Sequence, residues 1–332
     1  MLISKFENLI SFIKNKTILI TTHDSVDIDG FVSCIVIKYL LNHHFNMDNV
    51  LLFFFEFSKS TRQFMEKILD IFPEFNFSYH EHDDISDIDV MLILDTNNLE
   101  LINHKSKKDI PFIYIDHHID QNSKYDNNLK SYNIVLDNYS STIEILLDIC
   151  ELYQIKLPLV LKWLSVSAIL TDSGFFKYGD NQTIIRTSKM LDNDLNIQDI
   201  FSLLKKEEDI SERIAKIKGM QRIKLIHEDK YIIGVSNVSS YEASVANSMI
   251  LIGFDISIVL SQKKSEYRIT TRATKEICIK TGLHLGEILG EIANISGGNA
   301  GGHDGAASLN GNYNPEKVLE TIIEKVKETI NN

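Results

Sequence analysis

The chain has 332 residues, of which 44% are hydrophobic and 24% are charged, and its formal net charge at pH 7 is −12. This length allows two domains with a buried core in each, and the composition is ordinary for a soluble globular protein. The negative charge argues against a long nucleic-acid duplex as a partner, because such affinity comes largely from Lys and Arg on phosphates. No apolar run approaches the roughly 20 residues that span a bilayer, so we expect a cytoplasmic protein without a membrane partner.

The first half alternates between apolar, strand-like runs and amphipathic helical stretches. This alternation predicts an α/β fold, with a parallel sheet that carries helices on both faces. The predicted strands are "TILITT" at 17–22, "VLLFFF" at 50–55, "IDVMLIL" at 88–94 and "PFIYI" at 111–115. The predicted helices lie at about 30–43, 61–71, 140–155 and 158–171.

Three of these four strands lead directly into residue types that bind metals. The first is followed by His23, Asp27 and Asp29, the third by Asp95, and the fourth by the triplet at 116–118, Asp-His-His. Ligand sites in open parallel sheets lie beyond the carboxyl ends of the strands, so these side chains are predicted to meet at one edge.

The rest of the chain changes character twice. Residues 189–225 are polar with interspersed Lys and Glu, which predicts a linking helix with a solvated face. A second alternating region follows, with strands and helices between 231 and 294 and then the glycine-rich "SGGNAGGHDGAAS" at 296–308. A terminal helix is predicted from Pro315. This region is expected to form a smaller mixed α/β domain.

Each candidate ligand also has a purely structural interpretation. A lone Asp such as Asp27 is a helix N-cap or turn residue roughly nine times in ten, and "DTNN" from Asp95 suits an Asx turn. Asp172 ends an apolar helix, where a carboxylate is unfavourable to the helix dipole and a bound cation would favour it. Carboxylates and imidazoles without thiolates suit manganese or magnesium, and a pair of ions about 3.5 to 4 Å apart is typical of phosphate-ester hydrolysis.

The motifs "HDSVDID", "LDTNN", "DHH" and "ILTDSG", in this order, resemble the four motifs of the DHH phosphoesterases. The segments "YRITTR" and "GGNAGGHDGAAS" resemble the first type of their associated C-terminal domain. The resemblance implies a DHH catalytic domain at 1–188, a helical linker at 189–225 and a substrate-binding domain at 226–332. Asn299 and Ala300 interrupt the glycine tail and Ser308 stands where glycine is common, departures that bear on the substrate more than on catalysis.

The resemblance also implies the roles of individual residues. Two divalent metal ions, manganese first with magnesium or cobalt as alternatives, would be held by His23, Asp27, Asp29, Asp95, His117 and Asp172. Asp95 would bridge the ions and, with Asp116 and His118, form the catalytic group, in which Asp116 orients an imidazole and His118 points at the substrate phosphate. The remaining substrate contacts would come from Arg272, Gly301, Gly302 and His303.

Within the family, chain length and the compact tail resemble the branch of nanoRNases and 3′-phosphoadenosine 5′-phosphate phosphatases. The implied substrate is a very short single-stranded RNA or a small nucleotide, and the resemblance leaves a homodimer open. Three alternatives remain: a RecJ-like exonuclease on longer single strands, a cyclic dinucleotide phosphodiesterase, and a non-catalytic nucleotide-binding protein.

Overall fold

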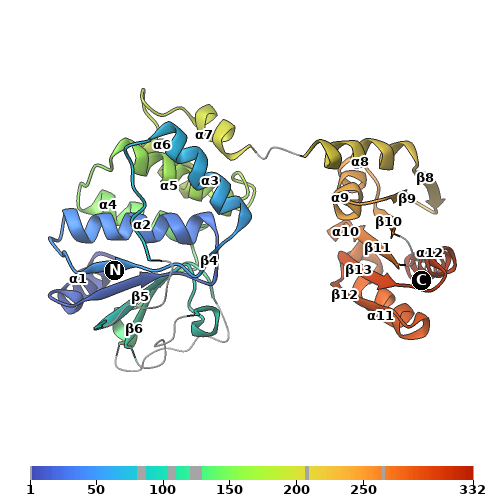
Figure 1. The fold of residues 1–332 in the computed structure, drawn as a ribbon, viewed down its shortest axis with the longest axis horizontal. Helices are drawn as coiled ribbons and strands as arrows, with labels where there is room; N and C mark the ends of the chain where they lie inside the picture. The colour runs from blue at the N-terminus through green and yellow to red at the C-terminus, as the bar shows by residue number, and fades with distance from the viewer. Residues whose placement is uncertain are drawn as a thin grey trace. The chain divides into compact units, whose positions relative to one another are not determined.

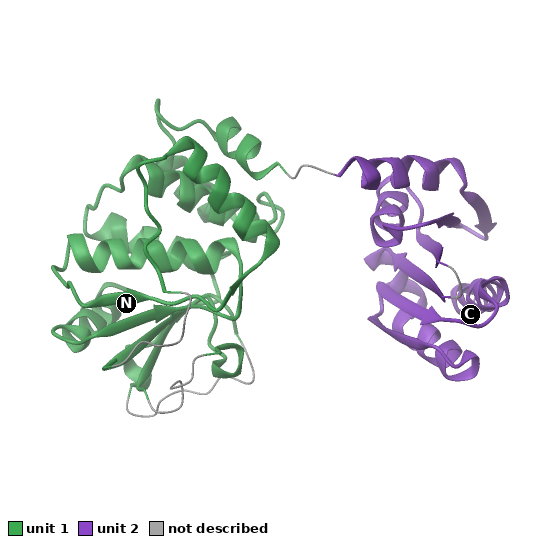
Figure 2. Ribbon diagram, in the orientation of Figure 1, with its two compact units in different colours: residues 1–205 green, residues 206–332 purple. Residues whose placement is uncertain are grey.

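The computed structural model describes residues 2–80, 87–103, 110–119, 129–205, 209–263 and 266–331. The chain forms two compact units, residues 1–205 and 206–332, shown in green and purple in Figure 2. The boundary between the two units follows Lys205, inside the segment 189–225 that was predicted to be a linker. The first unit is built on a parallel sheet and the second on a mixed sheet, so the predicted α/β class is confirmed.

The sheet of the first unit has five parallel strands in the order β3-β1-β5-β6-β7. Their bounds are β1 Ile18–Thr21, β3 Val50–Leu52, β5 Val90–Leu94, β6 Phe112–Asp116 and β7 Ile134–Val135. Every residue of β1 and β5 is buried, as expected for central strands covered on both faces. The four strands predicted in this half are confirmed. A separate parallel pair is formed by β2, Ser25–Val26, and β4, Glu56–Phe57.

Helices of the first unit enclose its main apolar core (Figure 1). Their bounds are α1 Leu2–Ile13, α2 Ile28–His43, α3 Lys59–Ile71, α4 Thr142–Leu152, α5 Leu159–Asp172, α6 Asn181–Met190 and α7 Ile197–Leu204. Side chains such as Ile20, Leu92 and Ile113 face this core. The alternate side chains, among them Leu19, Met91 and Tyr114, pack under the 3-10 helix η1, Leu99–Leu101.

The second unit has a six-stranded sheet in the order β12-β13-β11-β10-β9-β8, in which only β9 and β10 pair in parallel. Its strands are β8 Lys224–Glu228, β9 Tyr231–Val238, β10 Ile256–Lys263, β11 Glu266–Ala273, β12 Asn299–His303 and β13 Ala306–Gly311. Its helices are α8 Ile210–Gln221, α9 Glu242–Leu251, α10 Lys275–Thr281, α11 Leu285–Ser296 and α12 Pro315–Asn331. Helices α8 and α9 pack with the sheet in one apolar cluster, and helices α10 to α12 pack with the sheet in a second apolar cluster.

The predicted linking helix is two helices that belong to different units. A reciprocal cap between Asn196 and Asp199 begins α7, whose Ile200 packs with Val166 and Leu170 in the first unit. Helix α8 instead packs on the second unit, where Ala215 lies in the same apolar cluster as Val245. Among the described residues, no helix is long and apolar enough to cross a bilayer.

Candidate metal centre

The centre of the site is the edge of the parallel sheet where β1, β5 and β6 end. These three strands are neighbours, with Leu92 paired to both Ile20 and Ile113. Because the strands are parallel, their carboxyl ends adjoin, and His23, Asp95 and the residues that follow Ile115 lie close together. These side chains therefore lie together at one edge of the sheet, as the sequence predicted.

The amino ends of two helices supply the next carboxylates. Asp27 caps α2, accepting a hydrogen bond from the Gly30 amide at 2.9 Å. Asp29 lies in the first turn of α2, is only 1% exposed, and accepts the Thr142 amide at 2.6 Å and the Ile143 amide at 3.1 Å. Those two amides begin α4, so the unpaired donors and dipole of a second helix hold the buried carboxylate in place.

Asp95 lies at the middle of the site and is 4% exposed. Its φ of 60° is in the left-handed region, which Asp and Asn adopt more readily than other residues with a side chain. Its Oδ1 accepts a hydrogen bond from the Thr142 hydroxyl at 3.0 Å. Glycine at position 30 leaves room for these side chains, because a Cβ there would lie 2.4 Å from Thr22 Oγ1 and 3.2 Å from Asp95 Oδ2 and would displace them.

His117 connects the sheet edge to the end of α5. Its Nδ1 lies 3.2 Å from the Tyr139 carbonyl oxygen, so Nδ1 carries the proton in that contact. Its Nε2 lies 3.2 Å from Asp172 Oδ2 and 3.5 Å from Asp95 Oδ1. Asp172 is the last residue of α5, where the sequence predicted that something positive must offset its charge.

Asp116 is fully buried at the end of β6, and it positions His118. Its Oδ1 accepts from the His118 amide at 3.1 Å and contacts Nδ1 of the same ring at 2.9 Å. The side chain of His118 is 52% exposed, so its Nε2 is the nitrogen left to meet a ligand. The geometry agrees with the predicted orienting role of Asp116, a role that itself stays a prediction.

These side chains form three overlapping groups that could hold a cation. Within each group the ligand atoms lie within 4.8 Å of one another, and the groups are His23, Asp27 and Asp95; Asp29, His117 and Asp172; and Asp95, Asp116, His117 and His118. All six residues predicted as metal ligands belong to one of them. Asp95 and His117 each occur in two groups. The group of Asp29, His117 and Asp172 does not contain Asp95, which reaches it through His117 Nε2 at 3.5 Å. The two oxygens of Asp95 can face two neighbouring ions, whereas the one free nitrogen of His117 can bind a single ion.

Family comparisons bear directly on this arrangement. The model of the DHH family N-terminal domain matches residues 17–169, and the DHHA1 domain model matches residues 228–332. The chain belongs to the DHH phosphoesterase family. An uncharacterized protein of Methanocaldococcus jannaschii is 28% identical over 96% of this chain and 94% of its own length. An exopolyphosphatase-related protein from Bacteroides fragilis, 17% identical, shares the fold with a TM-score of 0.62 over 100% of this chain and 98% of its own.

DHH family proteins are metal-dependent phosphoesterases, and the charges of this site fit that requirement. Burial and the neighbouring charge of Asp172 raise the pKa of Asp29 to about 7. Burial and Asp29 likewise raise the pKa of Asp95 well above its usual value. Burial lowers the pKa of His117, but contacts with Asp172 and Asp95 raise it to about 11. The carboxylates repel one another and the His117 imidazolium offsets them in part, a role that divalent cations would fill more completely.

Unsatisfied polar atoms support the same fit. Among the described residues, the buried atoms without a hydrogen-bond partner include Asp116 Oδ2 and Thr22 Oγ1, while His117 Nε2 makes no hydrogen bond beyond its carboxylate contacts with Asp172 and Asp95. Buried polar atoms are nearly always paired, so these atoms fit a site whose residues would hold a cation. The Tyr139 carbonyl leaves His117 Nε2 as the nitrogen that can bind a metal in the neutral ring.

The predicted substrate residues lie in the second, DHHA1 unit. Arg272 on β11 and His303 on β12 both pair with Ala306 of the intervening strand β13, so they are close across the sheet. The Arg272 guanidinium donates to Asn247 Oδ1 at 3.0 Å and to the Thr271 carbonyl at 2.9 Å. Gly302 has a packing reason of its own to be glycine, because at φ 152° a Cβ would lie 2.3 Å from the Ala306 carbonyl oxygen.

Two residues of the DHH site were missed from the sequence. Thr142 contacts Asp29 through its amide and Asp95 through its hydroxyl, and Tyr139 orients His117 through its carbonyl. The run Ser-Ser-Thr at 140–142 before an apolar helix signals a helix start with free amide donors. Only the tertiary fold shows which carboxylate receives them.

Metal binding to this site should stabilise the first unit selectively. Manganese at about 100 times its Kd is expected to add about 2.7 kcal/mol, or about 5 to 10 °C in Tm for a unit of this size. Calorimetry with and without a chelator, combined with hydrogen exchange, checks this. Protection should concentrate in residues 18–33 and 90–97. Equal protection in the two units would contradict specific binding at this site.

Proposed function

We propose that this chain is a two-metal-ion phosphoesterase that removes phosphate or nucleotides from very short RNA and small nucleotides, in the manner of nanoRNases and 3′-phosphoadenosine 5′-phosphate phosphatases. The observation that carries the proposal is the position of Asp95. It is buried between two cation-ligand groups and donates an oxygen to each, so one carboxylate can join two ions. Manganese is the metal we expect first, because the donors are oxygen and imidazole nitrogen without thiolate.

The residues of the site divide the chemistry among them. Divalent ions bound there would polarise the phosphoryl oxygens and supply an activated water for in-line attack. Asp29 is kept in position by the α4 amides, and His117 by the Tyr139 carbonyl. His118 is held through Nδ1 by Asp116, which leaves the exposed Nε2 to contact a substrate phosphate oxygen as negative charge develops.

Charge supports a small substrate over a long one. A protein that tracks a long single strand needs a basic, aromatic-lined groove, whereas this chain carries a net charge of −12. Its predicted anion contacts, Arg272 with Gly301, Gly302 and His303, are few and gathered on one sheet of the DHHA1 unit. A nucleotide or a very short RNA is the size of ligand that such a site serves.

A manganese-dependent time course tests the proposal. RNA strands from two to about twenty nucleotides would be compared with adenosine bisphosphate and cyclic dinucleotides, with chelator as the control. Fast loss of the shortest strands or of the bisphosphate is the expected result. Preferential degradation of the long strands would assign a RecJ-like exonuclease, and preferential loss of cyclic dinucleotides a phosphodiesterase. Inactivity on every substrate would favour a non-catalytic nucleotide-binding protein.

A further inference from the structure

The DHHA1 sheet presents a row of polar side chains at the end opposite to Arg272. Side chains alternate along β11, so Arg268, Thr270 and Arg272 share one face. On this face the pairing register aligns Arg268 with Ser261 of β10 and Asn310 of β13, and Asn310 with Asn299 of β12. Four neighbouring strands therefore contribute one polar side chain each to a single row.

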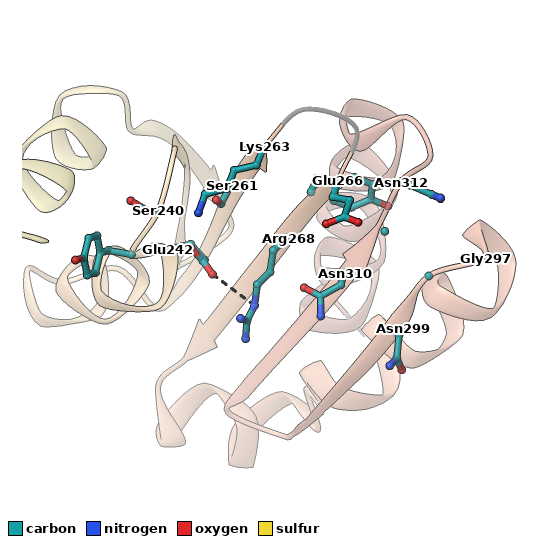
Figure 3. Close-up of a pocket in the computed structure, with 14 residues that line it drawn as sticks. Ser240, Glu242, Ser261, Lys263, Glu266, Arg268, Gly297, Asn299, Asn310 and Asn312 are labelled. Atoms are coloured by element: carbon teal, nitrogen blue, oxygen red, sulfur yellow. Dashed lines mark ion pairs between the residues drawn. The ribbon is translucent and has the colours of Figure 1, made fainter. Parts of the chain in front are cut away.

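A pocket of about 730 Å³ lies over this row (Figure 3). Its lining includes Tyr241, Glu242, Arg268, Asn299 and Asn310. Arg268 is half exposed, and its Nε pairs with Glu242 at 3.4 Å. In Figure 3, Glu242 and Asn310 lie on opposite sides of Arg268.

The chemistry of the lining suits a nucleobase more than a free phosphate. Lys263 and Arg268 are balanced by Glu242 and Glu266, so the pocket has little net charge to attract an anion. Guanidinium and carboxamide groups offer donors, while the carboxamides and carboxylates offer acceptors, and these are the groups that pair with the edges of bases. Tyr241 adds an aromatic ring, on which the face of a base can stack.

The row between this pocket and Arg272 has small side chains and is open on its β12 side. It consists of Val259 and Thr270, which are fully buried, and of Ser308 and Gly301; the hydroxyls of Thr270 and Ser308 are 3.1 Å apart. A Cβ at Gly301 would have no neighbour within 4 Å, so open space lies above it. Arg268 and Arg272 are four residues apart, or about 13 Å along the strand, more than one phosphate can span.

We propose that this pocket binds the base of a further nucleotide in the substrate, beyond the one predicted to bind at Arg272 and His303. The inference rests on the proposed function and adds a base-binding subsite at the other end of the sheet. It implies that the chain distinguishes an oligonucleotide from a mononucleotide through Arg268, Asn310 and Tyr241.

Calorimetric binding to the 332-residue chain in chelator, where metal-dependent hydrolysis does not occur, tests this inference. The ligands are adenosine bisphosphate, a trinucleotide, and the same trinucleotide with each base removed in turn. In the wild type, loss of one particular base should weaken binding about tenfold, the value of one base stacked on an aromatic ring. In a variant that combines Tyr241→Ala, Arg268→Gln and Asn310→Ala, the same loss should have no effect. Lys317→Gln, an exposed cation on α12, is the matched control.

Affinity for adenosine bisphosphate should be equal in the wild type and in the combined variant. If base removal weakens binding equally in the wild type and the combined variant, the subsite is overturned. It is also overturned if the combined variant binds every ligand more weakly by the same factor, because that result indicates a contact with phosphate. If the wild type hydrolyses nucleotides but tolerates removal of every base, only the subsite fails. If the wild type binds none of these ligands in chelator and hydrolyses no nucleotide with manganese, the proposed function fails, and the subsite fails with it.

Discussion

Replacing Asp95 with asparagine is expected to lower kcat/KM by at least about 1,000-fold, or about 4 kcal/mol of transition-state stabilisation. Asparagine keeps the shape of the side chain and tolerates the φ of 60°, so the backbone is not strained. It removes the one charge that two cation-ligand groups share. Initial rates on the best substrate of the time course measure the effect.

Thermal unfolding separates a lost ligand from a damaged fold. Without metal, the Asp95→Asn variant should be at least as stable as the wild type, because a buried carboxylate that repels Asp29 has been neutralised. The stabilisation by manganese should be lost. Asp89→Asn is the control, since Asp89 precedes the same strand at its other end and accepts the Thr17 amide at 2.8 Å. Normal rates for Asp95→Asn would remove Asp95 from the mechanism.

The regular parts of the fold could be predicted because their signal is local. The apolar runs that became β1, β5 and β6 lie between helical patterns, and a parallel sheet follows from that order. The two-residue strands β2 and β4 are too short for any periodicity to show. The glycine-rich tail did not suggest strands, because glycine has low strand propensity, yet it forms the β12–β13 hairpin.

The site could be predicted as far as residue types carry chemical information. His23, Asp95 and Asp116 follow strands that the sequence already suggested were parallel neighbours, so their side chains could be grouped in advance. Contacts made by the backbone give no such signal. The amide of Thr142 and the carbonyl of Tyr139 hold Asp29 and His117, and only the three-dimensional packing of α4 against the sheet edge reveals them.

Arg186→Met is expected to lower the free energy of unfolding of the first unit by about 3 to 5 kcal/mol. Arg186 on α6 donates to Glu144, which is fully buried, at 2.9 Å and to both Asp148 oxygens at 2.7 and 2.8 Å. Methionine fills a similar volume but leaves Glu144 as an uncompensated buried charge. Chemical denaturation of the unit, followed by circular dichroism and by tryptophan fluorescence from Trp163, measures the loss.

The same network extends to the metal centre, so activity should change as well. The guanidinium of Arg186 lies over the Tyr139 ring at 4.4 Å, and the Tyr139 hydroxyl donates to Asp148 at 2.8 Å. The carbonyl of Tyr139 orients His117, so a displaced Tyr139 should weaken manganese binding about 10- to 100-fold. Arg186 is thus a positioning residue, and manganese affinity is the quantity that a purely structural role would leave unchanged.

Two further variants make the interpretation decisive. Lys189→Gln breaks an exposed ion pair with Glu151 between the same two helices, and it should cost less than about 1 kcal/mol. Adding Glu144→Gln to Arg186→Met neutralises the unpaired charge and should recover much of the lost stability, while manganese affinity stays low because Tyr139 still lacks its cation. Recovery of both quantities together would show that Arg186 acts on the site only through overall folding.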